Sequence, residues 1–337
     1  MNAQTDEDLS PLEQSGQPPA PAPVRIRPVT LTTYSLLGLI ITVWLAGRLG
    51  GPDVSGWLEQ HFAESAGEIW DGQYWRLVTY GLLHANLPHL LFNAYGLYVI
   101  GSLIELIYRP GRFLAGFFLA VLGGSVLGVL TAPSRDLFQA VGASGGLFGL
   151  VGMHMALVLN YRKVLHPQFL RASWTNLILV IGINGAYGLL NSQIDNAGHL
   201  GGFLAGLGWG LVITVPNFPA HIHPSRLWLK KIVFATTLAA AISYAILPKT
   251  DSVPYLHFTG HQALERDDTA SAIASFERLL TLQPDHVETQ YNLAVIYARQ
   301  GDYPAAAKHA NAALQLLPDN SQIKRLNEAL APLLTEP

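Results

Sequence analysis

Residues 141–150, VGASGGLFGL, place a single hydroxyl group among glycines and large apolar residues. A serine hydroxyl becomes a nucleophile when a neutral imidazole lies beside it to accept its proton. The segment 195–206, DNAGHLGGFLAG, offers such an imidazole in His199, again followed by glycines. Ser144 and His199 are therefore candidates for the nucleophile and the general base of an acyl-transfer reaction.

A third segment, HANLPHLLFN at 84–93, supplies polar groups of a different kind. His89 and Asn93 are four residues apart, so a helix would place them on one face. Loss of one N–H donor aimed at a developing oxyanion typically costs about 10²–10³ in rate. These two side chains are therefore candidates for an oxyanion hole beside Ser144.

Small residues recur at four-residue spacing after the candidate nucleophile and base. Gly145 and Gly149 follow the serine, and Gly202 and Gly206 follow the histidine. Such ridges of small residues let two helix backbones approach closely inside a membrane. We expect these glycines to be helix-packing residues that bring the hydroxyl within hydrogen-bond reach of the imidazole.

The composition indicates the solvent in which this chemistry would take place. The chain has 337 residues, of which 50% are hydrophobic and 13% are charged. An average soluble domain has about 25% charged residues, so the deficit indicates a protein that lies in a lipid bilayer. The net charge is −3 and no basic block occurs, which predicts no nucleic-acid partner. Cysteine is absent, which excludes disulfides and thiolate catalysis.

The apolar residues gather in long runs between residues 29 and 247, the expected membrane domain. Residues 1–28 form a proline-rich tail that is expected to stay disordered. A bilayer core requires about 20 apolar residues per helix. Seven spans are predicted, at 30–48, 84–107, 111–131, 143–160, 174–193, 197–215 and 228–247. The expected fold class is all-α: a polytopic membrane helical bundle with a six-helix core and a seventh transmembrane helix.

Arginine and lysine are distributed unevenly between the connections of these spans. Short cytoplasmic connections collect basic residues, and one side has most of them: Arg25, Arg27, Arg109, Arg112, Arg162, Lys163, Arg171, Arg226, Lys230 and Lys231. The opposite connections hold Arg48, Arg76 and Arg135. The amino terminus is therefore expected in the cytoplasm and the carboxyl terminus outside. On this assignment the candidate site lies in the outer leaflet.

Five motifs occur in order between residues 75 and 215. They are WRLVTYGLLH at 75–84, the His-x-x-x-Asn of 89–93, Gly101 and Glu105 followed by GRF at 111–113, GASGGLFG at 142–149, and GHLGGFLAG at 198–206. Together they resemble the rhomboid family of intramembrane serine proteases. The resemblance implies that Ser144 is the nucleophile, that His199 is the general base, and that His89, Asn93 and the Ser144 backbone N–H form the oxyanion hole. It also implies that the substrate is a transmembrane protein, cleaved in or near its membrane segment.

The sequence departs from the family pattern at two positions. Phe148 stands where some members have tyrosine, which still allows a ring to stack on His199, and Gly198 stands where alanine is common. Two alternatives belong to other functional classes. One is a catalytically inactive rhomboid-like binder of transmembrane helices, and the other is a membrane-anchored repeat scaffold. A fluorophosphonate probe separates both from a protease, because it labels only an activated serine.

Several polar residues also have simpler interpretations. Ser144 alone could be a packing residue, and His199 alone could cap a helix. His84, His89, His154 and His199 raise the question of zinc, but no His-Glu-x-x-His spacing occurs, so no metal and no cofactor are expected. Asp195 could orient His199 as a third triad member, or it could favour the start of the sixth helix.

Two further expectations concern residues away from the candidate site. Glu105 lies near the inner end of the second span and is expected to be structural. Four aromatic residues in the 49–83 connection are expected to be interfacial anchors on the outer leaflet: Trp57, Trp70, Tyr74 and Trp75.

Beyond residue 248 the composition becomes that of a soluble helical segment. AIASFERLLTLQPD at 272–285 aligns with AAKHANAALQLLPD at 306–319, which gives a 34-residue period. The segment resembles tetratricopeptide repeats in its small and aromatic residues: Leu293, Ala294, Tyr297, Gly301, Ala306 and Ala313 in the second repeat, and Thr259, Gly260 and Ala263 in the first. We expect a linker at 248–255 and a repeat domain at 256–334, capped by a helix at 321–334.

The expected partners follow from these two parts. The membrane part would lie in a bilayer, with the bacterial inner membrane as the expected location, and would act on transmembrane protein substrates. The repeats would bind a protein or peptide on the outer side, although a spacer or a dimer contact is an alternative role.

Overall fold

The computed structural model describes residues 30–131, 139–191, 194–216 and 224–334. Within these ranges the chain forms helices and no strand, apart from one isolated bridge between Glu64 and Ala140. The expected all-α fold class is confirmed. The predicted tail at 1–28 lies outside the described residues.

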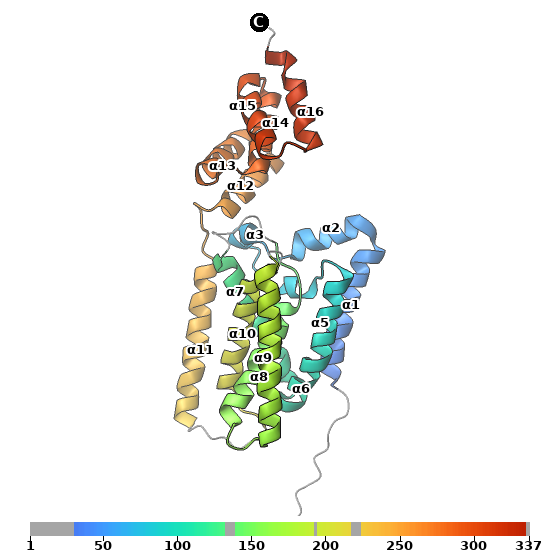
Figure 1. Ribbon diagram of the computed structural model, residues 1–337. Coiled ribbons are helices and arrows are strands. Elements are labelled where there is room, and N and C mark those ends of the chain that lie inside the picture. Colours follow the sequence, from blue (N-terminus) through green and yellow to red (C-terminus); the bar gives the residue numbers. More distant parts are fainter. Residues whose placement is uncertain (1–29, 132–138, 192–193, 217–223, 335–337) are drawn as a thin grey trace, which may run out of the picture.

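Seven helical segments form the bundle of Figure 1. Six of them are long and apolar enough to cross a membrane: α1 (Leu31–Leu49), the continuous segment Leu87–Tyr108, α7 (Pro110–Thr131), α8 (Ser144–Tyr161), α9 (Pro167–Leu190) and α11 (Pro224–Ala245). The segment Leu87–Tyr108 consists of α5 (Leu87–Gly96), the π-helical turn η3 (Leu97–Gly101) and α6 (Ser102–Tyr108). The seventh, α10 (Asn196–Val212), has 17 residues and packs against α7 and α8.

The fifth predicted span, at 174–193, differs most from its helix at the start. The fifth helix begins at Pro167, not at residue 174, because His166 caps it by accepting a hydrogen bond from the Gln168 N–H and the proline fits its first turn. Its first turns are polar, so hydrophobicity alone places the start too late. The predicted end of this span at residue 193 lies outside the described residues.

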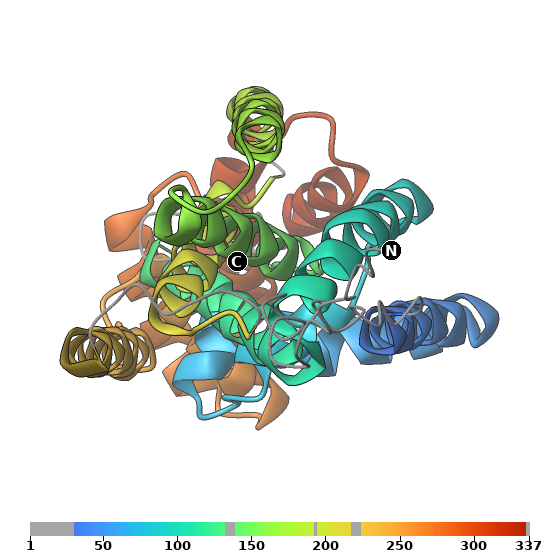
Figure 2. The ribbon, with the colours of Figure 1, turned by 90° about the horizontal axis from the view of Figure 1, so that it is seen from below.

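The most buried helices form the centre of the bundle. Figure 2, seen from below, shows α1, α9 and α11 at the periphery and α7, α8 and α10 inside. The largest fully buried side chains of this centre lie where α6, α7 and α8 meet, and include Tyr108, Phe113, Phe117, Leu150 and Met153. In a bilayer, side chains gain little by leaving lipid, so close packing between helices stabilises this centre. Ser144 lies on α8 of this centre, and α10, which carries His199, packs against α7 and α8.

Glu105 joins the start of α1 to α6. Its carboxylate accepts hydrogen bonds from the backbone N–H groups of Thr32 and Thr33 at 3.1 and 2.7 Å, and from the Thr33 hydroxyl at 2.7 Å. An acid at a helix N-terminus satisfies donors that have no partner inside the helix. The structure therefore agrees with a structural role for Glu105.

The connection between α1 and α5 contains four short helices: α2 (Gly51–Phe62), α3 (Ala66–Trp70), α4 (Arg76–Thr79) and the 3₁₀ turn η2 (Tyr80–Leu82). The prediction that Trp70 is an interfacial anchor is wrong. Trp70 is 5% exposed, its indole N–H donates to the Ala245 carbonyl at 2.9 Å, and its ring packs against Tyr255. The composition of the connection gave no sign that a later segment covers this residue. Trp57, Tyr74 and Trp75 are each about half exposed.

The carboxyl-terminal helices stack beyond one end of the bundle (Figure 1). They are α12 (Val253–Glu265), α13 (Thr269–Leu282), α14 (Val287–Gln300), α15 (Tyr303–Leu316) and α16 (Ser321–Leu330). Asp268 and Asp302 start α13 and α15 in the same way, each by accepting a hydrogen bond from a backbone N–H of the first turn. The repeated cap agrees with the 34-residue period seen in the sequence.

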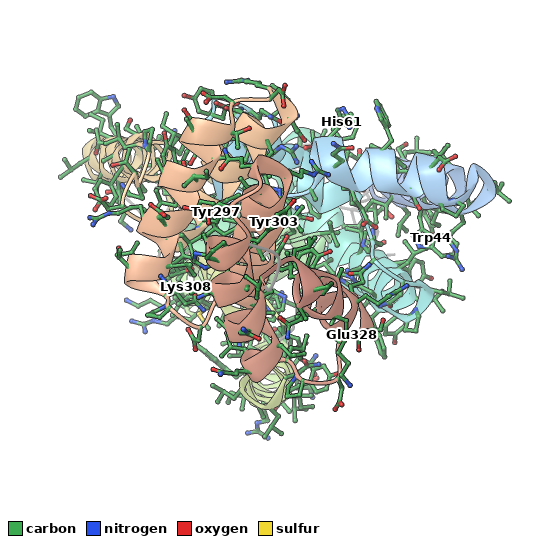
Figure 3. All side chains as sticks on the ribbon, turned by 90° about the horizontal axis from the view of Figure 1, so that it is seen from above. Trp44, His61, Tyr297, Tyr303, Lys308 and Glu328 are labelled. Atoms are coloured by element: carbon green, nitrogen blue, oxygen red, sulfur yellow. The ribbon has the colours of Figure 1, made fainter. Side chains whose placement is uncertain are left out.

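The first repeat helix lies directly on the membrane bundle. Phe258 of α12 lies so close to Gly67 of α3 that a Cβ on this glycine would be 2.5 Å from the Phe258 Cβ. Gln262, one turn later, donates to the Asp71 carboxylate at 3.1 Å. Figure 3, seen from the repeat side, shows Tyr297, Tyr303 and Lys308 on the repeat helices, with Trp44 of α1 away to one side. The repeats therefore cover only part of this end of the bundle.

Candidate active site

The structure brings Ser144 and His199 into contact. Ser144 is the first residue of α8, and His199 lies in the first turn of α10. The His199 Nε2 atom lies 2.9 Å from the Ser144 Oγ atom, a normal length for a hydrogen bond. Both residues are partly buried, so the pair is neither fully exposed nor sealed in the core. This geometry allows the imidazole to accept the proton of the hydroxyl.

Phe148 holds the plane of the imidazole. Its ring lies one turn after Ser144 on α8 and stacks on His199 with centroids 4.3 Å apart and planes 18° apart. A stacked ring limits rotation of the imidazole about its last side-chain torsion. The stacking that the sequence left open for phenylalanine is therefore present in the structure.

The four glycines at four-residue spacing lie where α8 and α10 approach each other. A Cβ on Gly202 of α10 would lie 2.1 Å from the Gly145 carbonyl oxygen of α8, and a Cβ on Gly206 would lie 2.0 Å from the Gly149 carbonyl oxygen. Any side chain at these positions would push the two helices apart. The absence of side chains thus sets the helix separation at which the hydroxyl and the imidazole meet.

Gly142 gives the turn before Ser144 its shape. Its φ of +133° is one that L side chains rarely adopt, and a Cβ there would lie 2.6 Å from the His89 ring. Its N–H donates to the Tyr80 carbonyl at 3.0 Å, and the next N–H, of Ala143, lies 3.5 Å from Nε2 of His84. Sequence reasoning did not single out Gly142 or Tyr80, because their partners lie on distant segments.

His89 and Asn93 lie on the same side of this turn. A Cβ on Gly142 would contact the His89 ring, and it would also lie 3.6 Å from the Asn93 Nδ2 atom. Asn93 is 5% exposed, and within the described part of the chain its Nδ2 atom is buried without a hydrogen-bond partner. Buried donors normally have partners, so an available amide beside the candidate nucleophile needs an explanation. A charge that forms during a reaction would supply the partner.

Asp195 lies at the N-cap position of α10. Its backbone carbonyl accepts the His199 N–H at 3.0 Å, and its carboxylate Oδ2 lies beside Gly198 and Gly128. The side chain makes no cap hydrogen bond, so the placement agrees with the helix-start interpretation only as an acidic residue near a helix N-terminus. A role in orienting the imidazole stays an alternative prediction.

The other histidines considered for zinc lie on two sides of the site. The rings of His84 and His89 have centroids 5.1 Å apart, beside the turn that precedes Ser144. His154 is buried in the middle of α8, with its ring near Phe169 of α9. His84 lies beside the turn that precedes Ser144, and its Nε2 atom faces the backbone N–H of Ala143.

Comparison with known proteins identifies the membrane part. Residues 71–216, which carry α4 to α10 and the whole candidate site, match the rhomboid domain. This part of the chain is a rhomboid domain. Residues 259–321 match a tetratricopeptide repeat, so a rhomboid domain is followed here by helical repeats, as the sequence motifs indicated.

Three relatives with rhomboid names are similar to the chain. Rhomboid protease GluP of Bacillus subtilis is 28% identical over 304 residues, which are 80% of this chain and 58% of that protein. The putative rhomboid protease YdcA of the same organism is 29% identical over 183 residues, which are 54% of this chain and 87% of that protein. RHOMBOID-like protein 5 of Arabidopsis thaliana is 36% identical over 155 residues. The chain spans about half the length of GluP and of the Arabidopsis protein.

Proposed function

We propose that the chain is an intramembrane serine endopeptidase that cleaves transmembrane proteins in or near their membrane segment. Ser144 is the nucleophile and His199 is the general base of this reaction. The observation that carries the proposal is the 2.9 Å contact between the Ser144 hydroxyl and the His199 imidazole, at the interface of α8 and α10. The rhomboid domain and the protease names of similar proteins support the same reaction class.

The proposed reaction has two halves. In the first, Oγ of Ser144 attacks the scissile carbonyl while Nε2 of His199 takes the hydroxyl proton, and the tetrahedral intermediate collapses when the imidazole returns that proton to the leaving amine. In the second, His199 takes a proton from water, the resulting hydroxide attacks the acyl ester, and the proton returns to Oγ. Each half restores the neutral imidazole, so the cycle needs no metal and no cofactor.

Asn93, His89 and the Ser144 backbone N–H are the proposed oxyanion donors. The side-chain amide of Asn93 supports this assignment because it is buried near Gly142 and has no partner among the described residues. When a donor is already in place before the reaction, no reorganisation energy is required as the negative charge forms. Such a donor stabilises the transition state more than the bound substrate.

The proposed orientation follows from the basic residues and from which helix ends meet. Arg109 lies between α6 and α7 and Arg112 lies in the first turn of α7, while the α8–α9 connection contains Arg162 and Lys163. Arg112 donates to the Thr214 carbonyl beyond α10, so these connections lie at one end of the bundle. The site and the repeats lie toward the other end (Figure 1). By the positive-inside rule the basic end faces the cytoplasm, and the repeats and the site face the outside.

A fluorophosphonate probe tests the proposal against its two rivals. The full chain in detergent should be labelled covalently at Ser144, since the probe reacts only with an activated serine. Ser144→Ala should abolish labelling, and Ser125→Ala is the matched control, because Ser125 is a fully buried serine of α7. An inactive binder of transmembrane helices or a repeat scaffold would give no labelling that depends on Ser144.

A further inference from the structure

Two histidines and one glutamate converge in the repeat segment, away from the membrane site. His257 and His261 are one turn apart on α12, and Glu288 lies in the first turn of α14. Each offers one ligand atom, and the three atoms lie within 4.8 Å of one another. Among the described residues this is the one such group of histidine and acidic side chains. Sequence reasoning missed it because α13 separates the histidine pair from the glutamate along the chain.

The distances between the ligand atoms match the edges of a metal tetrahedron. Nε2 of His257 lies 3.2 Å from Nε2 of His261 and 3.4 Å from Glu288 Oε2, while Nε2 of His261 lies 3.5 Å from Glu288 Oε1. Ligands about 2.0–2.1 Å from a tetrahedral zinc ion would be about 3.3–3.4 Å from each other. The three side chains therefore already have the separations that a shared ion requires.

The surroundings keep the two imidazoles in place. The Phe276 ring of α13 packs against both, with centroids 6.4 Å from His257 and 5.5 Å from His261. The side-chain amide of Asn292 lies 3.2 Å from Nε2 of His261, next to the remaining side of the cluster. The amide atom nearest the cluster is Nδ2, which is not a metal ligand, so a water molecule would complete four-coordination.

We propose that His257, His261 and Glu288 bind one transition-metal ion, with Zn²⁺ as the preferred occupant. Two imidazoles and one carboxylate suit zinc and its neighbours in the first transition series, whereas magnesium and calcium prefer sites made only of oxygen. The cluster lacks the neighbouring glutamate of one class of zinc peptidases. Zinc peptidases with paired histidines on a helix place glutamate directly after the first histidine, and here Phe258 occupies that position.

The ion would fix the first repeat helix relative to the second repeat. The ligands on α12 and α14 belong to different helix pairs, so a shared ion links the two pairs across α13. The stripe of α12 next to the histidines carries Phe258 and Gln262, which contact α3 of the membrane bundle. Metal binding would therefore stiffen the helix by which the repeats rest on the rhomboid domain.

A metal-free cluster is the physical rival. Neutral imidazoles can donate hydrogen bonds to the carboxylate and to each other at these same distances. The two cases differ in their affinity for added metal. A cluster held together only by hydrogen bonds would not bind zinc at a fixed stoichiometry of one ion per chain. A direct titration of metal therefore separates them.

The test uses the untagged full chain in detergent, freed of metal with a chelator that is then removed. Calorimetric titration with Zn²⁺ should show one saturable site, and zinc should raise the midpoint of thermal unfolding. His261→Asn and Glu288→Gln should each weaken zinc binding more than about 100-fold, since loss of an outer-shell partner alone costs about 10–100-fold. Added Co²⁺ should give the absorption of a tetrahedral centre.

His309→Gln is the matched control, because His309 lies in the same repeats and bonds to Gln290 outside the cluster. It should bind zinc as the unaltered chain does. Glu288 is partly exposed, so Glu288→Gln is the variant that keeps the fold intact if His261→Asn does not. The absence of saturable zinc binding, or binding that neither variant weakens, would overturn the proposal.

Discussion

Ser144 and His199 are 55 residues apart in the sequence, yet their side chains meet at 2.9 Å because glycines remove the side chains that would keep α8 and α10 apart. The contact depends on backbone approach at Gly145 and Gly149 of α8, which lie against Gly202 and Gly206 of α10. A single methyl group at Gly202 or Gly206 would meet a carbonyl oxygen of α8. The contact between the two proposed catalytic side chains therefore depends on the close packing of α8 against α10.

Asn93→Ala should lower kcat by about 10²–10³ while KM changes much less, because the amide acts where negative charge develops. Steady-state cleavage of a short transmembrane substrate by the reconstituted chain measures both constants. Asn191→Ala is the matched control, since this asparagine lies at the end of α9 and is partly exposed. A variant with unchanged kcat would make Asn93 a packing residue.

Gly202→Ala should destabilise the bundle by roughly 1–3 kcal/mol, the usual effect of adding a methylene to a packed core, and should abolish cleavage by separating the dyad. Gly182→Ala is the control, because nothing lies within 4 Å of a Cβ at this position of α9. It should leave activity unchanged. Thermal unfolding and cleavage of both variants in the same detergent would check this. Equal effects of the two substitutions would contradict the role given to the α8–α10 contact.

Phe258→Ser combined with Gln262→Ala should release the repeats from α3 without touching the dyad. We expect cleavage of a short generic substrate to stay the same. Cleavage of a substrate whose ectodomain binds the repeats should slow by at least about tenfold, because repeats that no longer rest on α3 hold the substrate at a lower effective concentration near the site. Leu316→Ala, at a half-exposed position of α15, is the control. A parallel loss on both substrates would indicate damage to the membrane domain.

A single cysteine tests the orientation without background labelling, because the chain contains none. Asp319→Cys should react with a membrane-impermeant maleimide in intact cells, since Asp319 is fully exposed beside α16. The neighbouring Asn320 is unsuitable for this test, because its side chain caps α16. Lys163→Cys, at the opposite end of the bundle, should react only after the cells are opened. The reverse pattern would contradict the proposed orientation.

The sequence alone predicted the helical bundle, the repeats and the side chains that meet at the site. Hydrophobic runs and basic residues were enough for the spans, since a bilayer imposes both signals. Contacts between distant segments were not predictable in the same way. Trp70 looked like a lipid anchor because nothing in its own segment shows that α12 and the end of α11 cover it.

The glycines also fall into two groups, those that the sequence pattern predicted and one that it did not. Those at helix spacing were identified because the ridge repeats every four residues. Gly142 was not, since its requirement is a local φ of +133° and a close approach of His89, and neither leaves a periodic pattern. The cluster of His257, His261 and Glu288 likewise requires knowledge of how α12 and α14 pack.

The proposed protease activity is tested by incubating a purified single-pass membrane protein with the purified chain in proteoliposomes. We expect the unaltered chain to produce two fragments whose new ends lie in or near the membrane segment, and a chelator should not prevent this. Ser144→Ala and His199→Ala should each abolish the fragments, and the double variant should be no worse, because the two residues act as one unit. Cleavage by Ser144→Ala at a rate close to that of the unaltered chain would contradict the account.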